Sequence, residues 1–121
     1  MLKSKITVLA FVLLLSGLVY AQSDQQKKPE AYKFAEFGKI SAKEMRDKLR
    51  SFYAVLIGSP DLKGFIINYG PVAEIRERRD AIVKLALRCE DCRIIFVDGS
   101  AEPKVRTILW VAPPGADDPK L

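Results

Sequence analysis

The sequence predicts an α+β fold, a two-layer α/β sandwich in which two helices pack on a mixed four-stranded sheet in the order β-α-β-α-β-β. Three observations support this prediction. Two stretches place apolar residues at helical spacing, four short stretches have the composition of strands, and Gly, Pro or Asp residues stand between them. Because helices on a sheet bury each other's apolar sides, this order of elements is typical of a two-layer domain.

The first strand is expected over residues 32–37 and ends at Gly38. Ser41 and Glu44 then form a capping box, with Ser41 as the N-cap of the first helix. The apolar residues that follow fit one helical face. They are Met45, Leu49, Phe52, Tyr53, Leu56 and Ile57. Pro60 and the residues after it end the helix.

The second strand is expected over residues 65–69 and the second helix over about 72–88. Five residues build the apolar side of this helix. They are Val72, Ile75, Ile82, Val83 and Ala86. At 100° per residue, Arg79 falls inside that stripe, between Ile75 and Val83.

Residues 93–97 form an apolar run typical of a central strand, and a turn joins them to the last strand, 105–111. We expect these two strands to pair antiparallel. One face of the last strand carries Thr107, Leu109 and Val111, and the other carries Arg106, Ile108 and Trp110. The domain is expected to span 31–112, and residues 113–121 to form a flexible tail.

The first 21 residues have the three-part layout of a secretory signal. Lys3 and Lys5 give a basic start, residues 6–18 are almost continuously apolar, and small residues stand at 19 and 21. The apolar run is shorter than the roughly 18–20 residues that a membrane span needs. We therefore expect cleavage after Ala21, a periplasmic or secreted location and no membrane span in the mature chain, which begins with a disordered linker over 22–30.

Charge and composition exclude several kinds of function. Two of the 20 basic residues lie in the signal segment, so the mature chain keeps 18 basic and 15 acidic residues, a net charge of +3. This charge is too small to indicate a nucleic-acid-binding protein. The chain has no histidine, which excludes Ser-His and Cys-His nucleophile pairs and histidine metal ligands. We therefore expect a protein that is not an enzyme and needs neither cofactor nor metal.

Cys89 and Cys92 are the only thiols, and in an oxidising compartment we expect them to form a disulfide. Their spacing is also that of a thioredoxin-type redox motif. That chemistry needs the first cysteine at a helix N-terminus, whereas this pair follows a helix and encloses two acids. A structural disulfide is therefore the favoured interpretation, and a thiol-disulfide oxidoreductase is the alternative. Zinc would need two more ligands from another chain.

Residues 75–83, Ile-Arg-Glu-Arg-Arg-Asp-Ala-Ile-Val, resemble the second helix of OmpA-like domains, which bind peptidoglycan in the bacterial periplasm. In that family's pattern, Leu-Ser-x-x-Arg-Ala-x-x-Val, Ile75 takes the first position, Arg79 the arginine and Val83 the valine. Arg76 and Asp80 depart from the pattern. The strand over 66–69 and the order of elements over 32–111 are also similar.

This resemblance implies an OmpA-like fold and a site at Arg79 for the amino-acid part of a peptide stem. The family's acidic residue after the preceding strand is missing, because Gly70-Pro71 stands there. Residues 63–70, 97–99 and 109–116 further resemble a group of small secreted bacterial proteins with no assigned activity, which implies nothing about mechanism.

Arg79 therefore has two interpretations. It either anchors a carboxylate near the start of a helix, where backbone N–H groups also favour negative charge, or pairs internally with Asp98 or Glu36. Because the family's acidic residue is missing, the internal pair is the favoured interpretation.

The strand face that bears Ile108 and Trp110 lies opposite both predicted helices. It either binds a partner, peptidoglycan or an envelope protein, or is covered by the N-terminal segment or the tail. The sequence thus predicts a non-catalytic binding or structural module of the cell envelope, associated with peptidoglycan if Arg79 binds ligand.

Overall fold

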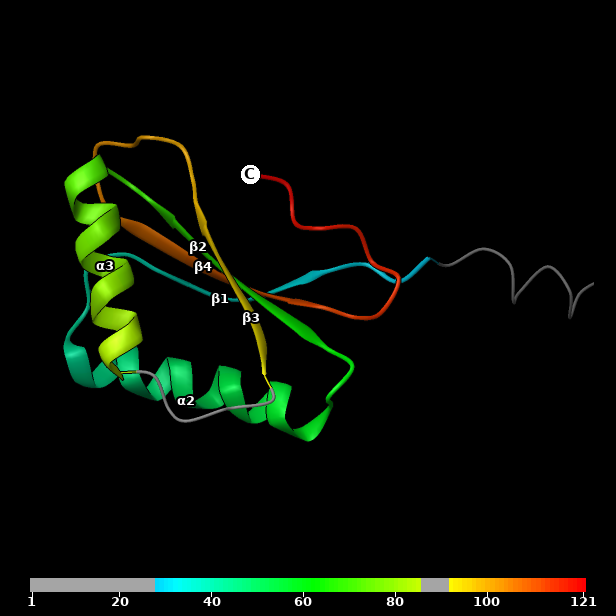
Figure 1. Ribbon diagram of the computed structural model, residues 1–121. Helices are drawn as coiled ribbons and strands as arrows, with labels where there is room; N and C mark the ends of the chain where they lie inside the picture. The colour runs from blue at the N-terminus through cyan, green and yellow to red at the C-terminus, as the bar shows by residue number, and fades with distance from the viewer. Residues whose placement is uncertain (1–27, 86–91) are drawn as a thin grey trace, which may run out of the picture.

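The computed structural model describes residues 28–85 and 92–121 and confirms the predicted fold class (Figure 1). The elements are β1 (Tyr32–Phe37), α2 (Ala42–Gly58), β2 (Lys63–Tyr69), α3 (Val72–Leu85), β3 (Arg93–Asp98) and β4 (Arg106–Ala112). The predicted signal peptide, most of the predicted linker and Cys89 lie outside the described residues. Among the described residues, no helix is long and apolar enough to cross a membrane.

The four strands form one mixed sheet in the order β1-β4-β2-β3. β4 runs antiparallel to both of its neighbours, whereas β2 and β3 are parallel. The predicted pairing of the last two strands is therefore wrong, and so is the central position of β3. Parallel neighbours need a crossover, which α3 provides. β3 lies on the edge because β4 pairs with the other side of β2 and not with β3. The loop after β3 crosses the end of β2, so that β4 pairs with the other edge of β2.

Helix α2 follows its local signals closely. The Ser41 hydroxyl accepts a hydrogen bond from the Glu44 N–H at 3.1 Å, as the capping box predicts. All of its predicted core residues are buried except Ile57, in the last turn. At Gly64, a Cβ atom would lie 2.7 Å from Leu56 Cδ1 and 2.8 Å from Phe52 Cζ. Glycine therefore lets α2 pack directly on the start of β2.

Helix α3 is rotated relative to the prediction. Ile75 and Ile82 are buried as expected, but Val72 is 69% exposed and Val83 is 53% exposed. Three half-buried residues that were not in the predicted apolar stripe complete the side that faces the sheet. These are Arg78, Ala81 and Leu85. The arginine within the core-facing stripe is therefore Arg78 and not Arg79. Ala86 and Arg88 lie outside the described residues.

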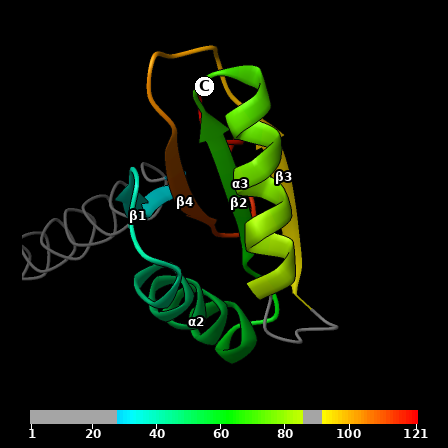
Figure 2. The same cartoon turned by 90° about the vertical axis from the view of Figure 1, so that its left-hand side faces the viewer.

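The sheet has an apolar core on each face. Both helices pack on one face, where Phe52, Ile66 and Leu109 are fully buried (Figure 2). On the other face, five buried residues form a second cluster: Phe65, Ile67, Tyr69, Ile108 and Ala112. The C-terminal segment 113–121 turns back across this second face (Figure 1), and its Ala116 packs against the cluster.

The loop between β3 and β4 is held against the end of β2 by backbone hydrogen bonds. The Gly99 N–H donates to the Asn68 carbonyl at 2.7 Å, and the Glu102 N–H donates to the Gly70 carbonyl at 3.2 Å. Gly70 has a φ of +142°, and a Cβ there would lie 2.8 Å from Val105 Cα. Only glycine fits this crossing, which brings the loop beside the start of α3.

Candidate functional site

A cavity of about 210 Å³ lies where the first half of α3 meets the end of β3 and the loop that follows. Three charged side chains line it: Arg76 and Arg79 from α3, and Asp98 from the last position of β3. The rest of the lining is Val72, Ile75 and two small loop residues, Gly99 and Ala101. The small loop residues leave the charged groups open to a ligand.

Arg79, the predicted binding residue, is exposed and has no internal acidic partner among the described residues. Its guanidinium lies 5.5 Å from the centre of the Phe96 ring, a cation–π contact that fixes its direction. The expected ion pair with Asp98 or Glu36 is not formed. Glu36 instead accepts from Arg106 at 3.0 Å and from Lys33 at 3.4 Å.

Arg78 occupies the structural position that the sequence assigns to Arg79. Its Nη1 donates to Thr107 Oγ1 at 3.0 Å and its Nη2 donates to the Gly38 carbonyl at 2.8 Å. Thr107 donates in turn to Asn68 Oδ1 at 2.6 Å. Burial lowers the pKa of the Arg78 guanidinium, since a less polar environment disfavours its charged form. Arg78 is thus a tie between α3 and the sheet and is not available to a ligand.

The charges around the cavity can hold a carboxylate beside an ammonium group. Arg76 and Arg79 form no hydrogen bond to an acidic side chain in the described part of the chain, so both guanidinium groups can donate to a bound carboxylate. The N-terminal end of α3, at Val72, adds further positive potential. Asp98 offers an acceptor for a cationic group across the same cavity. This arrangement of charges suits a ligand that carries both a carboxylate and an ammonium group.

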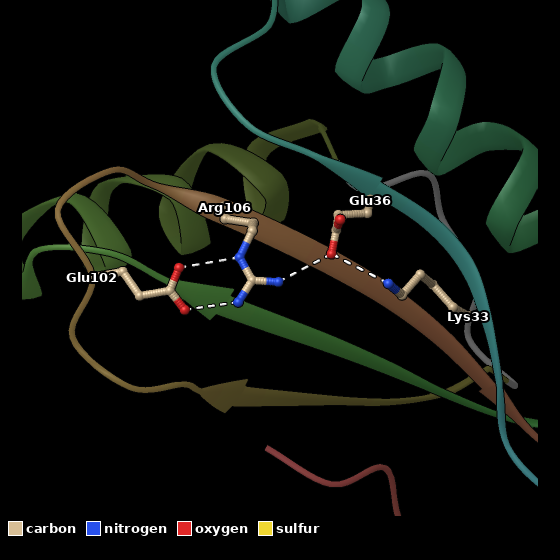
Figure 3. A network of polar contacts seen from close by, with 4 residues as sticks. All are labelled: Lys33, Glu36, Glu102 and Arg106. Atoms are coloured by element: carbon tan, nitrogen blue, oxygen red, sulfur yellow. Dashed lines mark hydrogen bonds and ion pairs between the residues drawn. The ribbon is translucent and has the colours of Figure 1, made fainter.

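A second polar network, which the sequence analysis missed, links the loop after β3 to β4 and β1 (Figure 3). Arg106 forms a fork with both oxygens of Glu102, at 3.1 and 2.7 Å, and its Nη1 bonds Glu36. The guanidinium also lies 4.2 Å from the centre of the Tyr69 ring. These contacts join β1, β4 and the loop. The i,i+4 spacing of Glu102 and Arg106 was the available signal, but it falls outside any helix.

The Arg106 fork shifts the titration of both partners. Its hydrogen bonds to Glu102 hold the pKa of that carboxyl below its usual range. The same contact, with help from Glu36, raises the pKa of Arg106. Because Arg106 is saturated by two acids, the network holds the loop in place and is a poor site for an anionic ligand.

The face that bears Ile108 and Trp110 is covered, as one of the two interpretations expects. Ile108 is 5% exposed and belongs to the second cluster. Residues 28–31 and 117–120 line a cavity of about 370 Å³ together with Trp110. Trp110 Nε1 is buried and has no hydrogen-bond acceptor.

The cysteine pair is only partly within the described residues. Cys92 immediately precedes β3, whereas Cys89 lies outside the described residues, so the predicted disulfide stays a prediction. Counting free thiols by alkylation of air-purified protein tests it. Within residues 28–85 and 92–121, no three His, Cys, Asp or Glu side chains gather in a way that could hold a metal ion.

Comparison with known proteins identifies no relative. The chain matches no protein-family model, no curated protein and no solved structure.

Proposed function

We propose that the chain is a periplasmic or secreted binding module of the cell envelope, and that it holds the amino-acid part of a peptidoglycan stem in the cavity between α3 and the loop after β3. The observation that carries the proposal is the pair of arginines, Arg76 and Arg79, which line one cavity and have no acidic partner among the described residues. Arginines that line a cavity without an acidic partner favour a carboxylate ligand.

Asp98 supports an amino-acid ligand over a simple anion. The resemblance to OmpA-like domains implies an acid that pairs with the arginine, and Gly70-Pro71 replaces that acid here. Asp98 lines the same cavity from the neighbouring strand. It can accept a hydrogen bond from a ligand ammonium group while the arginines bind the carboxylate. The position of the acid differs, but the pair of opposite charges is kept.

Co-sedimentation with purified peptidoglycan tests this function. We expect wild-type protein to pellet with the polymer at low salt, and at least tenfold less of the Arg79→Ala variant to do so. Arg46→Ala is the matched control, because it removes one exposed positive charge from α2, away from the cavity. If the Arg46→Ala and Arg79→Ala variants lose retention equally, binding follows net charge alone and the site is not at the cavity. If wild-type protein does not pellet at all, peptidoglycan is not the ligand.

Asp98→Asn separates the two halves of the site. The amide keeps the size of the side chain but loses its charge, so it should weaken binding of a zwitterionic ligand. We expect this variant to pellet less than wild type. An increase in retention would indicate that the cavity binds only anions, because removal of the negative charge would then relieve repulsion.

A further inference from the structure

The second face of the sheet differs from the first in what covers it. Two helices pack on the first face, whereas on the second face the 113–121 segment crosses an apolar cluster that includes Phe65, Ile67 and Ile108 (Figure 1). The segment carries no helix or strand. An apolar sheet surface of this kind is normally paired with a regular element or a partner.

The 113–121 segment is held by few contacts. Its only backbone hydrogen bond among the described residues is its own turn, from the Ala116 N–H to the Pro113 carbonyl at 3.1 Å. Ala116 packs on the cluster, and Asp117 pairs with Lys28 at 2.9 Å. Both side chains of that pair are exposed, 62% for Lys28 and 85% for Asp117, so the pair is weak. The segment therefore covers the face without being locked to it.

The fit of the segment is also incomplete. The cavity of about 370 Å³ remains between Trp110, residues 28–31 and residues 117–120. Trp110 Nε1 is the one buried side-chain donor or acceptor among the described residues that lacks a partner. A buried N–H group without an acceptor is costly, and native structures rarely keep one without a reason. An occupant that displaces the segment and offers a carbonyl to Trp110 would satisfy it.

We propose that the second face is a docking surface for an extended, proline-containing acidic segment of another protein, and that residues 113–121 occupy it as a displaceable strap. The strap itself shows the chemistry that fits: Pro-Pro-Gly-Ala-Asp-Asp-Pro-Lys-Leu places a small residue on the apolar cluster and a carboxylate beside Lys28. Proline-rich segments dock on aromatic surfaces because their extended backbone is already ordered.

The strap sets the affinity that a partner must reach. A tethered segment acts at an effective concentration on the order of millimolar. A free peptide that binds the uncovered face with a Kd of about 0.1 mM would therefore bind the strapped protein about tenfold more weakly. A partner that also bonds Trp110 Nε1 gains an interaction that the strap lacks. Residues 113–121 thus cover the surface at low partner concentration and are displaced by a segment that fits it better.

The test measures binding of a labelled peptide with the sequence of residues 113–121 to full-length variants by fluorescence anisotropy. Ala116→Glu places a charge against the apolar cluster and should release the strap. We expect it to bind the peptide at least tenfold more tightly than wild type. Asp117→Lys breaks only the exposed ion pair and should increase binding by a smaller factor. Asp47→Lys, on the exposed side of α2 beyond the other face of the sheet, is the matched control with no expected effect. Circular dichroism shows whether each variant is folded.

Two further results decide the proposal. In the Ala116→Glu background, Lys28→Glu should weaken peptide binding several-fold, because Lys28 pairs with Asp117 of the segment, and unchanged affinity would place the peptide elsewhere and overturn the proposal. Equal peptide binding by wild type, Ala116→Glu and Asp117→Lys would also overturn it. If Ala116→Glu unfolds the domain and Asp117→Lys does not raise peptide binding, the strap is an integral part of the core and no displaceable cover exists.

Discussion

Arg78 on α3 donates a hydrogen bond to Thr107 on β4 at 3.0 Å, and this contact separates the roles of two adjacent arginines. Arg78 reaches the sheet and is also placed 5.4 Å from the centre of the Phe37 ring. Arg79, one residue later, lines the cavity instead. One arginine therefore holds the helix in place, and the other is left for a ligand.

Arg78→Ala should destabilise the domain. The change leaves the Gly38 carbonyl without its donor and removes one partner of Thr107, whose side chain is fully buried. Loss of hydrogen bonds from a charged donor costs roughly 2–3 kcal/mol. For a domain of this size, that corresponds to a fall in melting temperature of about 10–20 °C. Thermal unfolding followed by circular dichroism measures it.

Thr107→Val provides the control for that prediction. Valine keeps the shape of the side chain but can neither accept from Arg78 nor donate to Asn68. The loss of stability in the double variant should differ clearly from the sum of the losses in the two single variants, because both residues belong to one network. Simple additivity would mean that the hydrogen bond between them contributes nothing to stability.

Gly70→Ala should be markedly destabilising, because φ is +142° and the new Cβ would lie 2.8 Å from Val105 Cα. A strained backbone conformation costs about 1–3 kcal/mol. Gly58→Ala is the matched change: no atom lies within 4 Å of its Cβ position, at the end of α2. We expect it to be neutral or slightly stabilising. Equal melting temperatures for both variants would show that the loop does not press on Gly70.

Stability should fall in acid partly through Glu102. Its hydrogen bonds with Arg106 lower the pKa of this carboxyl in the folded state. Its contribution is therefore present above the ordinary glutamate range and is lost as pH falls through the lowered pKa. Glu102→Gln should lower stability at neutral pH and flatten the decline below about pH 4.5. A variant whose acid limb matches that of wild type would show that the fork does not stabilise the fold.

Local sequence signals predict the elements well, and non-local contacts decide what they miss. The Ser41 cap and the apolar spacing of α2 act within a few residues, so they appear in the structure as expected. The position of β3 depends on which strand pairs with β2, and no local pattern encodes that choice. A continuous apolar run suits an edge strand covered by α3 as well as a central one.

Non-local contacts also explain why the core-facing arginine of α3 is Arg78 and not Arg79. Arg78 lies three residues after Ile75 and four before Ile82, whereas Arg79 lies four after and three before. Both positions fit the helical stripe. The Gly38 carbonyl and Thr107, both remote in sequence, select Arg78. The cavity could be anticipated only in part, since Arg79 was identified but its grouping with Arg76 and Asp98 required the loop to fold back on α3.

The comparison of Arg78→Ala with Arg79→Ala in one melt and one peptidoglycan retention assay tests the central claim most directly. We predict that Arg79→Ala melts within about 4 °C of wild type, as an exposed change should, yet is retained at least tenfold less. Arg78→Ala should melt well below wild type and still be retained at a temperature where it is folded. Two results would contradict the assignment of the binding site to the cavity at Arg79. Either the Arg79→Ala variant is retained as well as wild type, or only the folded Arg78→Ala variant loses retention.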